Sequence, residues 1–141
     1  MSRVLIVDGH NAIFAIESLA AHHQINREQT REALVSWLQQ YQDSTDTQII
    51  VVFDGQGKTT TKQGGTNNQA LVIYSSQGVT ADAHIEQLAA KYSGHYQIMV
   101  ATQDMAIIHA VSESGASVIS IKKLADLIDS NQAELQKKWL K

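Results

Sequence analysis

The chain contains no cysteine and no proline, and it has no long hydrophobic run. Without cysteine it cannot form disulfides or thiolate zinc sites, so any bound metal must be held by oxygen or imidazole ligands. A membrane-spanning helix needs roughly 18 consecutive apolar residues, and no segment approaches that length. The first residues also lack the small-residue cleavage site that ends a signal peptide. We therefore expect a cytoplasmic protein that does not contact a membrane.

The same absences make one motif match accidental. His84, Ile85 and Glu86 spell the H-x-E half of the zinc deaminase signature, but the P-C-x-x-C half cannot exist in this chain. The other histidines show no ligand spacing, so we expect no histidine metal site. They are His10, His22, His23, His95 and His109.

Net charge is also small. The chain carries a net charge of -3 and has a pI near 6.0, which is not typical of a protein that holds nucleic acid by bulk electrostatics. Bound cations would offset clustered acids, however.

The 141 residues of the chain, 43% of them hydrophobic, are enough for one core of ordinary size. We predict one domain spanning residues 1–141, while the sequence makes no prediction about homo-oligomers.

Apolar runs alternate with helical patterns along the chain. Strands are predicted at residues 3–7, 48–53, 70–74, 96–101 and 116–121, and helices at residues 12–21, 26–43, 80–94, 104–114 and 122–139. This alternation predicts an α/β fold, a three-layer α/β/α sandwich with a mainly parallel, Rossmann-like sheet. Residues 55–68 include four glycines, four threonines and no apolar residue, which is typical of a mobile surface loop.

Acidic residues follow several of these predicted strands directly. Asp8, Asp54 and Asp104 each lie just past an apolar run, and parallel strands bring their carboxyl ends to one edge of the sheet. Asp82 and Glu86 are four residues apart and share a helix face. Five carboxylates can therefore converge.

Convergence is costly without a cation, because two carboxylates ~4 Å apart repel by roughly 4 kcal/mol at an effective dielectric of about 20. A hard divalent metal such as Mg²⁺ or Mn²⁺ removes that cost and activates water for phosphodiester hydrolysis. Each residue also has an ordinary structural role to set against this. Asp54 with Gly55 is typical of a turn, Asp104 of a helix cap and the pair Asp82 and Glu86 of a solvated face. Asn11 either caps the first helix or orients Asp8.

Four short motifs resemble the YacP-like proteins, which belong to the NYN branch of the PIN-like nucleases. They are VDGHN at 7–11, VVFD at 51–54, TADAHIE at 80–86 and ATQD at 101–104. The resemblance implies a metal-dependent endoribonuclease with Asp8, Asp54, Asp82 and Asp104 as its acidic, metal-binding site. It also implies that Asn11 and Glu86 support this site, that Thr102 contacts metal or phosphate, and that the substrate is mRNA on the ribosome.

The chain departs from that family pattern at two places. His10 stands where the family usually has an aromatic residue such as tyrosine, which affects a base-stacking or packing role at that position. The sequence ends at Lys141 without the longer basic tail expected for tight RNA or ribosome binding.

Two other functions compete with a nuclease. A receiver-like, phospho-accepting signalling domain could use Asp8 as a metal ligand and Asp54 as phosphoacceptor, although it would need a second acid beside Asp8 and a lysine in the region of Asp104. A PIN-like module could instead bind RNA or protein without cutting. Lys58 and Lys62 either carry the loop to an RNA backbone or belong to a tolerated surface loop.

Overall fold

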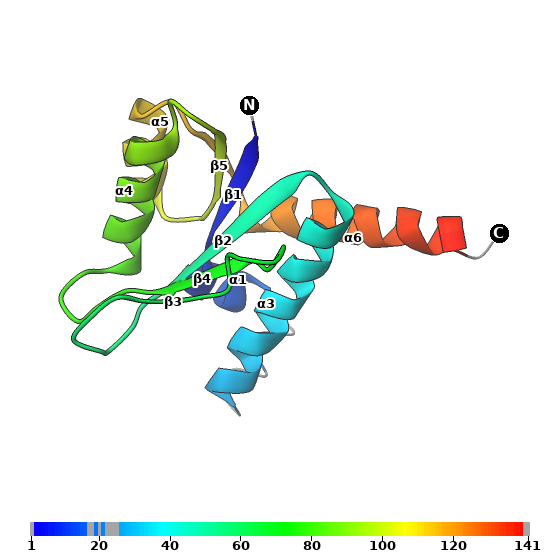
Figure 1. The fold of residues 1–141 in the computed structure, drawn as a ribbon, viewed down its shortest axis with the longest axis horizontal. Helices are drawn as coiled ribbons and strands as arrows, with labels where there is room; N and C mark the ends of the chain where they lie inside the picture. The colour runs from blue at the N-terminus through cyan, green and yellow to red at the C-terminus, as the bar shows by residue number, and fades with distance from the viewer. Residues whose placement is uncertain (1, 17–18, 20, 22–25, 140–141) are drawn as a thin grey trace.

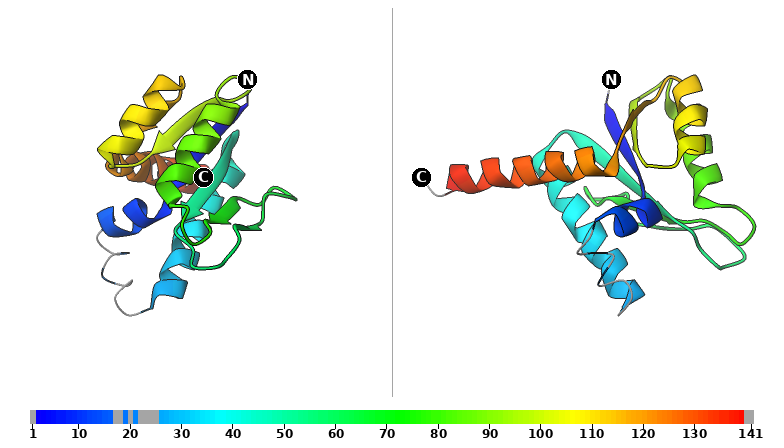
Figure 2. Two further views of the ribbon diagram at one scale, coloured as in Figure 1. Left: turned by 90° about the vertical axis from the view of Figure 1, so that its left-hand side faces the viewer. Right: turned by 180° about the vertical axis from the view of Figure 1, so that it is seen from behind.

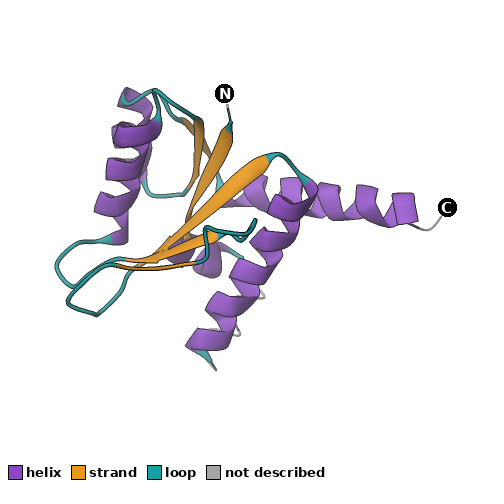
Figure 3. Cartoon of the chain, in the orientation of Figure 1, coloured by secondary structure: helices purple, strands orange, loops and turns teal. Residues whose placement is uncertain are grey.

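The computed structural model describes residues 2–16, 19, 21 and 26–139 (Figure 1). These residues form a six-stranded sheet with the strand order β3-β4-β2-β1-β5-β6, in which β3 is antiparallel to β4 and every other pair is parallel (Figure 3). The strands are β1 (Arg3–Asp8), β2 (Thr47–Phe53), β3 (Thr61–Gln63), β4 (Leu71–Tyr74), β5 (Gln97–Ala101) and β6 (Ser117–Ile119). The predicted α/β class and mainly parallel sheet are confirmed.

Helices pack on both faces of this sheet. They are α1 (Gly9–Ala15), α3 (Arg27–Ser44), α4 (Ala81–Tyr92), α5 (Met105–Glu113) and α6 (Ile121–Trp139). Among the described residues, no helix is both long and apolar enough to cross a membrane. Helix α6 runs past the sheet, as the view from behind shows (Figure 2).

Alternate residues of the central strands pack into two separate hydrophobic cores, one on each face of the sheet. Leu5 and Val7 of β1 face α1, α3 and α6, whereas Val4 and Ile6 face α4 and α5. A strand that is apolar on both faces reads as an uninterrupted hydrophobic run, which is why the sequence of β1 predicts a central strand. The two cores give the three-layer sandwich that the sequence predicts.

The strand order has its switch point beside β1. The chain first builds β1, β2 and β4 toward one side and then crosses back to place β5 against the free edge of β1. In open α/β sheets the ligand crevice lies at such a point, outside the carboxyl ends of the strands. Val7 pairs with Ala101 in the register, so Asp8 and Thr102 emerge together at this crevice.

Three predicted boundaries are wrong. The predicted loop at residues 55–68 contains β3, whose exposed side chains have no apolar pattern and whose pairing is made by the backbone. The first helix begins at Gly9 and ends at Ala15, because Asp8 caps its start and Ile16 is extended. Its predicted continuation to residue 21 falls partly on residues 17–18 and 20, which lie outside the described residues. Strand β6 covers only Ser117–Ile119 of the predicted run.

Candidate active site

Asp8 is the buried centre of the carboxyl edge. It is the last residue of β1 and is 2% exposed. Its Oδ1 accepts a hydrogen bond from the Asn11 backbone N–H at 3.4 Å, which caps α1, and its Oδ2 accepts from the Thr102 hydroxyl at 3.1 Å. Burial raises the pKa of Asp8, and these two hydrogen bonds oppose that rise.

A network of hydrogen bonds fixes the turn after β5 against β1. The buried Thr102 Oγ1 accepts from the Asp104 backbone N–H at 3.1 Å while donating to Asp8. The Asn11 side-chain oxygen accepts from the Gln103 backbone N–H at 2.8 Å. The Asn11 side chain therefore positions the 102–104 turn, while its backbone N–H donates to Asp8.

Asp104 caps α5 and also faces the acidic cluster. Its Oδ1 accepts from the Ala106 backbone N–H at 2.9 Å, and its carboxyl group lies close enough to Asp82 to raise the pKa of Asp82. Asp104 is therefore the helix cap expected from the sequence, and it also lies beside Asp82.

Asp54 joins the end of β2 to the start of α4. Its Oδ1 accepts from the Ala81 backbone N–H at 2.8 Å. The next residue, Gly55, lies so close to the Ser75 carbonyl that a Cβ atom would overlap it. Glycine is therefore required here to bring the chain after β2 against the end of β4.

The charges of all three other aspartates raise the pKa of Asp82. Asp82 lies in the first turn of α4, and its pKa is raised to about 6. Burial contributes most, followed by the hydrogen bond and charge of Asp104 and then by the charges of Asp8 and Asp54. Asp8, Asp54 and Asp104 therefore each lie close enough to Asp82 to disfavour its charged form.

These carboxyl groups do not form a compact ligand cage. Within the described part of the chain, no three histidine or acidic side chains meet in an arrangement that could hold a metal directly. The effect of the other three aspartates on the pKa of Asp82 shows that they lie near it. Direct coordination of one metal ion by all four would need them to be closer together. Mg²⁺ is usually bound through one or two carboxylates with water completing its shell, so this all-oxygen donor set fits such an ion.

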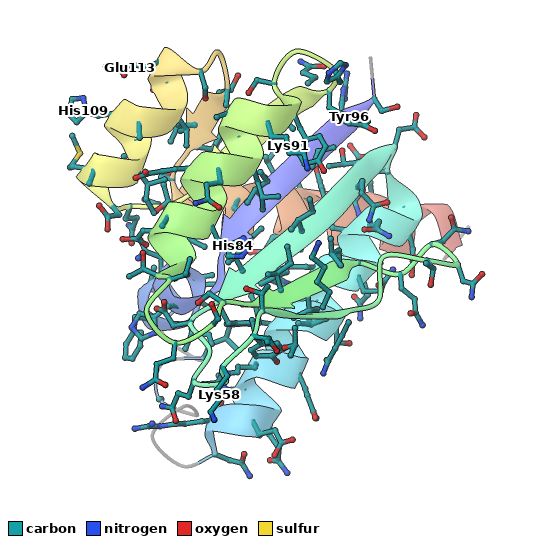
Figure 4. All side chains as sticks on the ribbon, turned by 60° about the vertical axis from the view of Figure 1, so that its left-hand side comes forward. Lys58, His84, Lys91, Tyr96, His109 and Glu113 are labelled. Carbon is teal, nitrogen blue, oxygen red and sulfur yellow. The ribbon has the colours of Figure 1, made fainter. Side chains whose placement is uncertain are left out.

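Three further residues, Glu86, Lys62 and Lys58, were predicted for the site. Glu86 is half-buried one turn after Asp82 but is not among the charges that raise the pKa of Asp82. Lys62, on β3, lines a cavity of about 810 Å³ together with Arg3 and Asp46, away from Asp54. Lys58 is exposed on the loop between β2 and β3, at the end of the molecule opposite Tyr96 (Figure 4).

A further cavity, of about 520 Å³, lies beside Asp54 and is lined in part by Arg27 and Arg31. This cavity was not predicted from the sequence. The four-residue spacing of the two arginines on a predicted helix was a usable signal. In the structure Gly9 begins α1, and a Cβ atom there would overlap the Phe53 ring.

The strand order disfavours the receiver-like alternative. If the short antiparallel β3 is set aside, the parallel strands follow the order third, second, first, fourth and fifth along the chain. Receiver-type sheets have the order second, first, third, fourth and fifth, with the first and third strands flanking their site. Here β2 and β5 flank β1 instead.

This Rossmann-like sheet, with aspartates gathered at its carboxyl edge, defines a chain of the PIN-like nuclease class. A model of the YacP-like NYN domain matches residues 5–141, and the chain belongs to that family. It is 30% identical to the protein YacP of Bacillus subtilis (strain 168) over 136 residues, which cover 96% of this chain and 80% of the relative.

Solved structures agree with this assignment. A crystal structure of Rae1 (YacP) from Bacillus subtilis is similar with a TM-score of 0.78 at 30% identity, covering 96% of this chain and 78% of that one. A crystal structure of a point mutant of the same protein gives a TM-score of 0.81 at 30% identity, covering 95% and 79%. The fold predicted from the sequence is thereby confirmed.

Proposed function

We propose that this protein is a cytoplasmic, divalent-metal-dependent endoribonuclease that hydrolyses RNA phosphodiester bonds. The observation that carries the proposal is the convergence of Asp8, Asp54, Asp82 and Asp104 from four segments at the switch point of the sheet. Membership of a PIN-like nuclease family supports it, since NYN nuclease domains generally depend on a divalent metal. The finer proposal for the substrate is mRNA, including mRNA on the ribosome.

Mg²⁺ or Mn²⁺, when bound, would supply Lewis acidity that activates water and stabilises the leaving oxygen. Asp82 and Asp104 are half-exposed and carry the mutual repulsion that a cation would relieve. Asp8 is held beneath them by Thr102, and Asp54 is anchored to the start of α4 by one oxygen. We assign these four aspartates to metal binding.

Thr102 and Asn11 are better described as positioning residues. Thr102 is 1% exposed, and its hydroxyl is shared between Asp8 and the Asp104 backbone. The Asn11 side-chain oxygen is occupied by the Gln103 N–H. Both therefore act by holding Asp8 and Asp104 in place, whereas the resemblance implied that Thr102 contacts metal or phosphate.

The proposal is tested by incubating end-labelled single-stranded RNA with the protein and Mn²⁺. The variants Asp8→Asn, Asp82→Asn and Asp104→Asn are compared with Asp126→Asn, which removes an exposed carboxylate from α6. We expect internal cleavage by the wild type and by Asp126→Asn, a loss of ~10²-fold or more in the other three, and no cleavage in EDTA.

Two outcomes would overturn the proposal. One is equal cleavage by the wild type and Asp8→Asn, which would indicate a contaminating nuclease. The other is an absence of cleavage by the wild type on both free RNA and ribosome-bound mRNA. RNA binding without cleavage would support the non-cutting PIN-like module instead.

A further inference from the structure

The cavity beside Asp54 combines aromatic and cationic walls. Its volume of about 520 Å³ falls within the range of roughly 300–1,000 Å³ that is usual for small-ligand sites. Helix α1, the start of α3 and the end of β2 form it, and Asp54 belongs both to its lining and to the acidic site. A molecule bound in this cavity would therefore lie directly beside Asp54 of the acidic site.

The aromatic wall is made by two side chains of α1. His10 and Phe14 are one turn apart on the same helix face, with ring centroids 4.6 Å apart and a tilt of 54° between the ring planes. Phe14 is 53% exposed although it is large and apolar. Aromatic rings displayed in this way are the platforms on which proteins stack the bases of single-stranded nucleic acids.

The cationic wall is made by Arg27 and Arg31 of α3. The two residues are four positions apart, so they share one helix face. The guanidinium carbon of Arg31 lies 5.8 Å from the centroid of the Phe53 ring. Such a cation–π contact uses the face of the guanidinium group and leaves its in-plane N–H donors for bidentate contact with a phosphate.

We propose that this cavity is a nucleotide subsite that takes one unpaired nucleotide of a single-stranded RNA. The base stacks on the Phe14 ring, with the tilted His10 ring beside it, and the adjoining phosphate binds Arg27 and Arg31. The inference rests on the proposed function, because Asp54 places this nucleotide next to the bond that is cut. It also explains how a chain of net charge -3 holds RNA beside a negative cluster.

The subsite selects for single strands. A base in a duplex is stacked on its neighbours and cannot turn its face to the protein without being unpaired. An unpaired base has both faces available, and stacking tolerates every base identity. We therefore expect strong preference for unpaired RNA and only weak base preference at this position.

The test uses single-stranded oligoribonucleotides with 2-aminopurine at successive positions, and a matched series with an abasic nucleotide at the same positions. Binding is measured in EDTA, so that metal-dependent cleavage does not interfere. One position should show fluorescence quenching by stacking, and removing its base should weaken binding by about 5- to 150-fold. Phe14→Ala should abolish the quenching and weaken binding similarly. Combined with the abasic RNA, it should cause no further loss.

The arginine wall is tested through salt dependence. Arg31→Gln should lower the slope of log affinity against log salt by about 0.7, as expected for one lost phosphate contact on a single strand. Arg31→Lys should keep the slope. The matched controls are Tyr96→Ala, an exposed ring at the other end of the molecule (Figure 4), and Arg3→Gln at the start of β1. Both should bind as the wild type does.

The outcomes separate this inference from the nuclease proposal. If the wild type cleaves RNA but Phe14→Ala keeps both the quenching and the abasic penalty, the subsite is wrong and the nuclease proposal stands. If the quenching depends on Phe14 but the wild type never cleaves, the subsite stands as an RNA-binding site and the nuclease proposal falls.

Discussion

The carboxyl group of Asp82 lies close enough to that of Asp104 for Asp104 to help raise the pKa of Asp82 to about 6. Asp82 comes from the first turn of α4, and Asp104 caps the start of α5. The two helices therefore bring a pair of carboxyl groups together at their N-terminal ends, where the repulsion between them depends on pH. A cation held between these carboxyl groups would relieve that repulsion and link the same two helices.

The first prediction concerns stability without a metal. The folded-state pKa of Asp82 is about 6, above its ordinary value of 3.8, so the folded state binds a proton more tightly than the unfolded state. The stabilisation is complete below about pH 4 and is lost as pH rises through about 6. In EDTA, Asp82→Asn should raise the thermal midpoint at about pH 7.5 by about 2 °C or more, with little effect at about pH 4. A difference between the two proteins that does not change with pH would contradict the prediction.

The second prediction concerns stabilisation by the cation. Mn²⁺ or Mg²⁺ should raise the thermal midpoint of the wild type, since a ligand that binds only the folded state at about 100 times its Kd adds ~2.7 kcal/mol. The rise should be larger above about pH 6 than below it, because protons compete for Asp82. It should disappear in Asp8→Asn and Asp82→Asn and persist in Asp126→Asn. Differential scanning fluorimetry measures it, and an equal rise in all four proteins would argue against a site at these aspartates.

The third prediction concerns Thr102. Thr102→Val keeps the shape of the side chain but removes the hydroxyl that donates to Asp8 and accepts from the Asp104 N–H. Leaving such buried partners unsatisfied costs about 1–3 kcal/mol, which urea unfolding should detect. Thr102→Ser retains the hydroxyl and should preserve most of the RNA cleavage that Thr102→Val loses. Equal losses of cleavage in the two variants would show that the hydroxyl is not sufficient to preserve cleavage and would contradict its proposed positioning role.

The fourth prediction concerns Gly9. Gly9→Ala should destabilise the protein by about 1–3 kcal/mol, because the new Cβ would overlap the Phe53 ring beneath the arginine wall of the nucleotide subsite. Gly94→Ala is the matched control, since a Cβ atom there meets nothing within 4 Å, and its effect should stay within about 0.5 kcal/mol. Phe53→Leu should partly rescue Gly9→Ala. If Gly9→Ala and Gly94→Ala were equally stable, the close approach to Phe53 would not be a constraint.

The sequence predicted the features that depend on local patterns. Asp8, Asp54 and Asp104 could be placed because each follows an apolar run, and Asp104 is also the helix cap that was expected there. Such features need only the periodicity of one element and the general rule for the carboxyl edge of parallel strands.

The features that the sequence did not predict depend on distant pairs or on the backbone. The Asn11 bond to the Gln103 N–H joins positions 92 residues apart, and the contact of Arg31 with Phe53 joins α3 to β2. Strand β3 is paired through backbone groups while its side chains are exposed. Neither kind of contact leaves a periodic pattern in one stretch of sequence.

The two outermost strands of the sheet limit how this protein can associate with itself. Among the described strands, β3 and β6 form the two edges, and each is three residues long. An edge this short offers few unpaired backbone groups to a second sheet, and Lys62 places a charge within β3. The sheet is thus poorly suited to strand-by-strand growth into fibres, so a concentrated solution should resist aggregation through its edges.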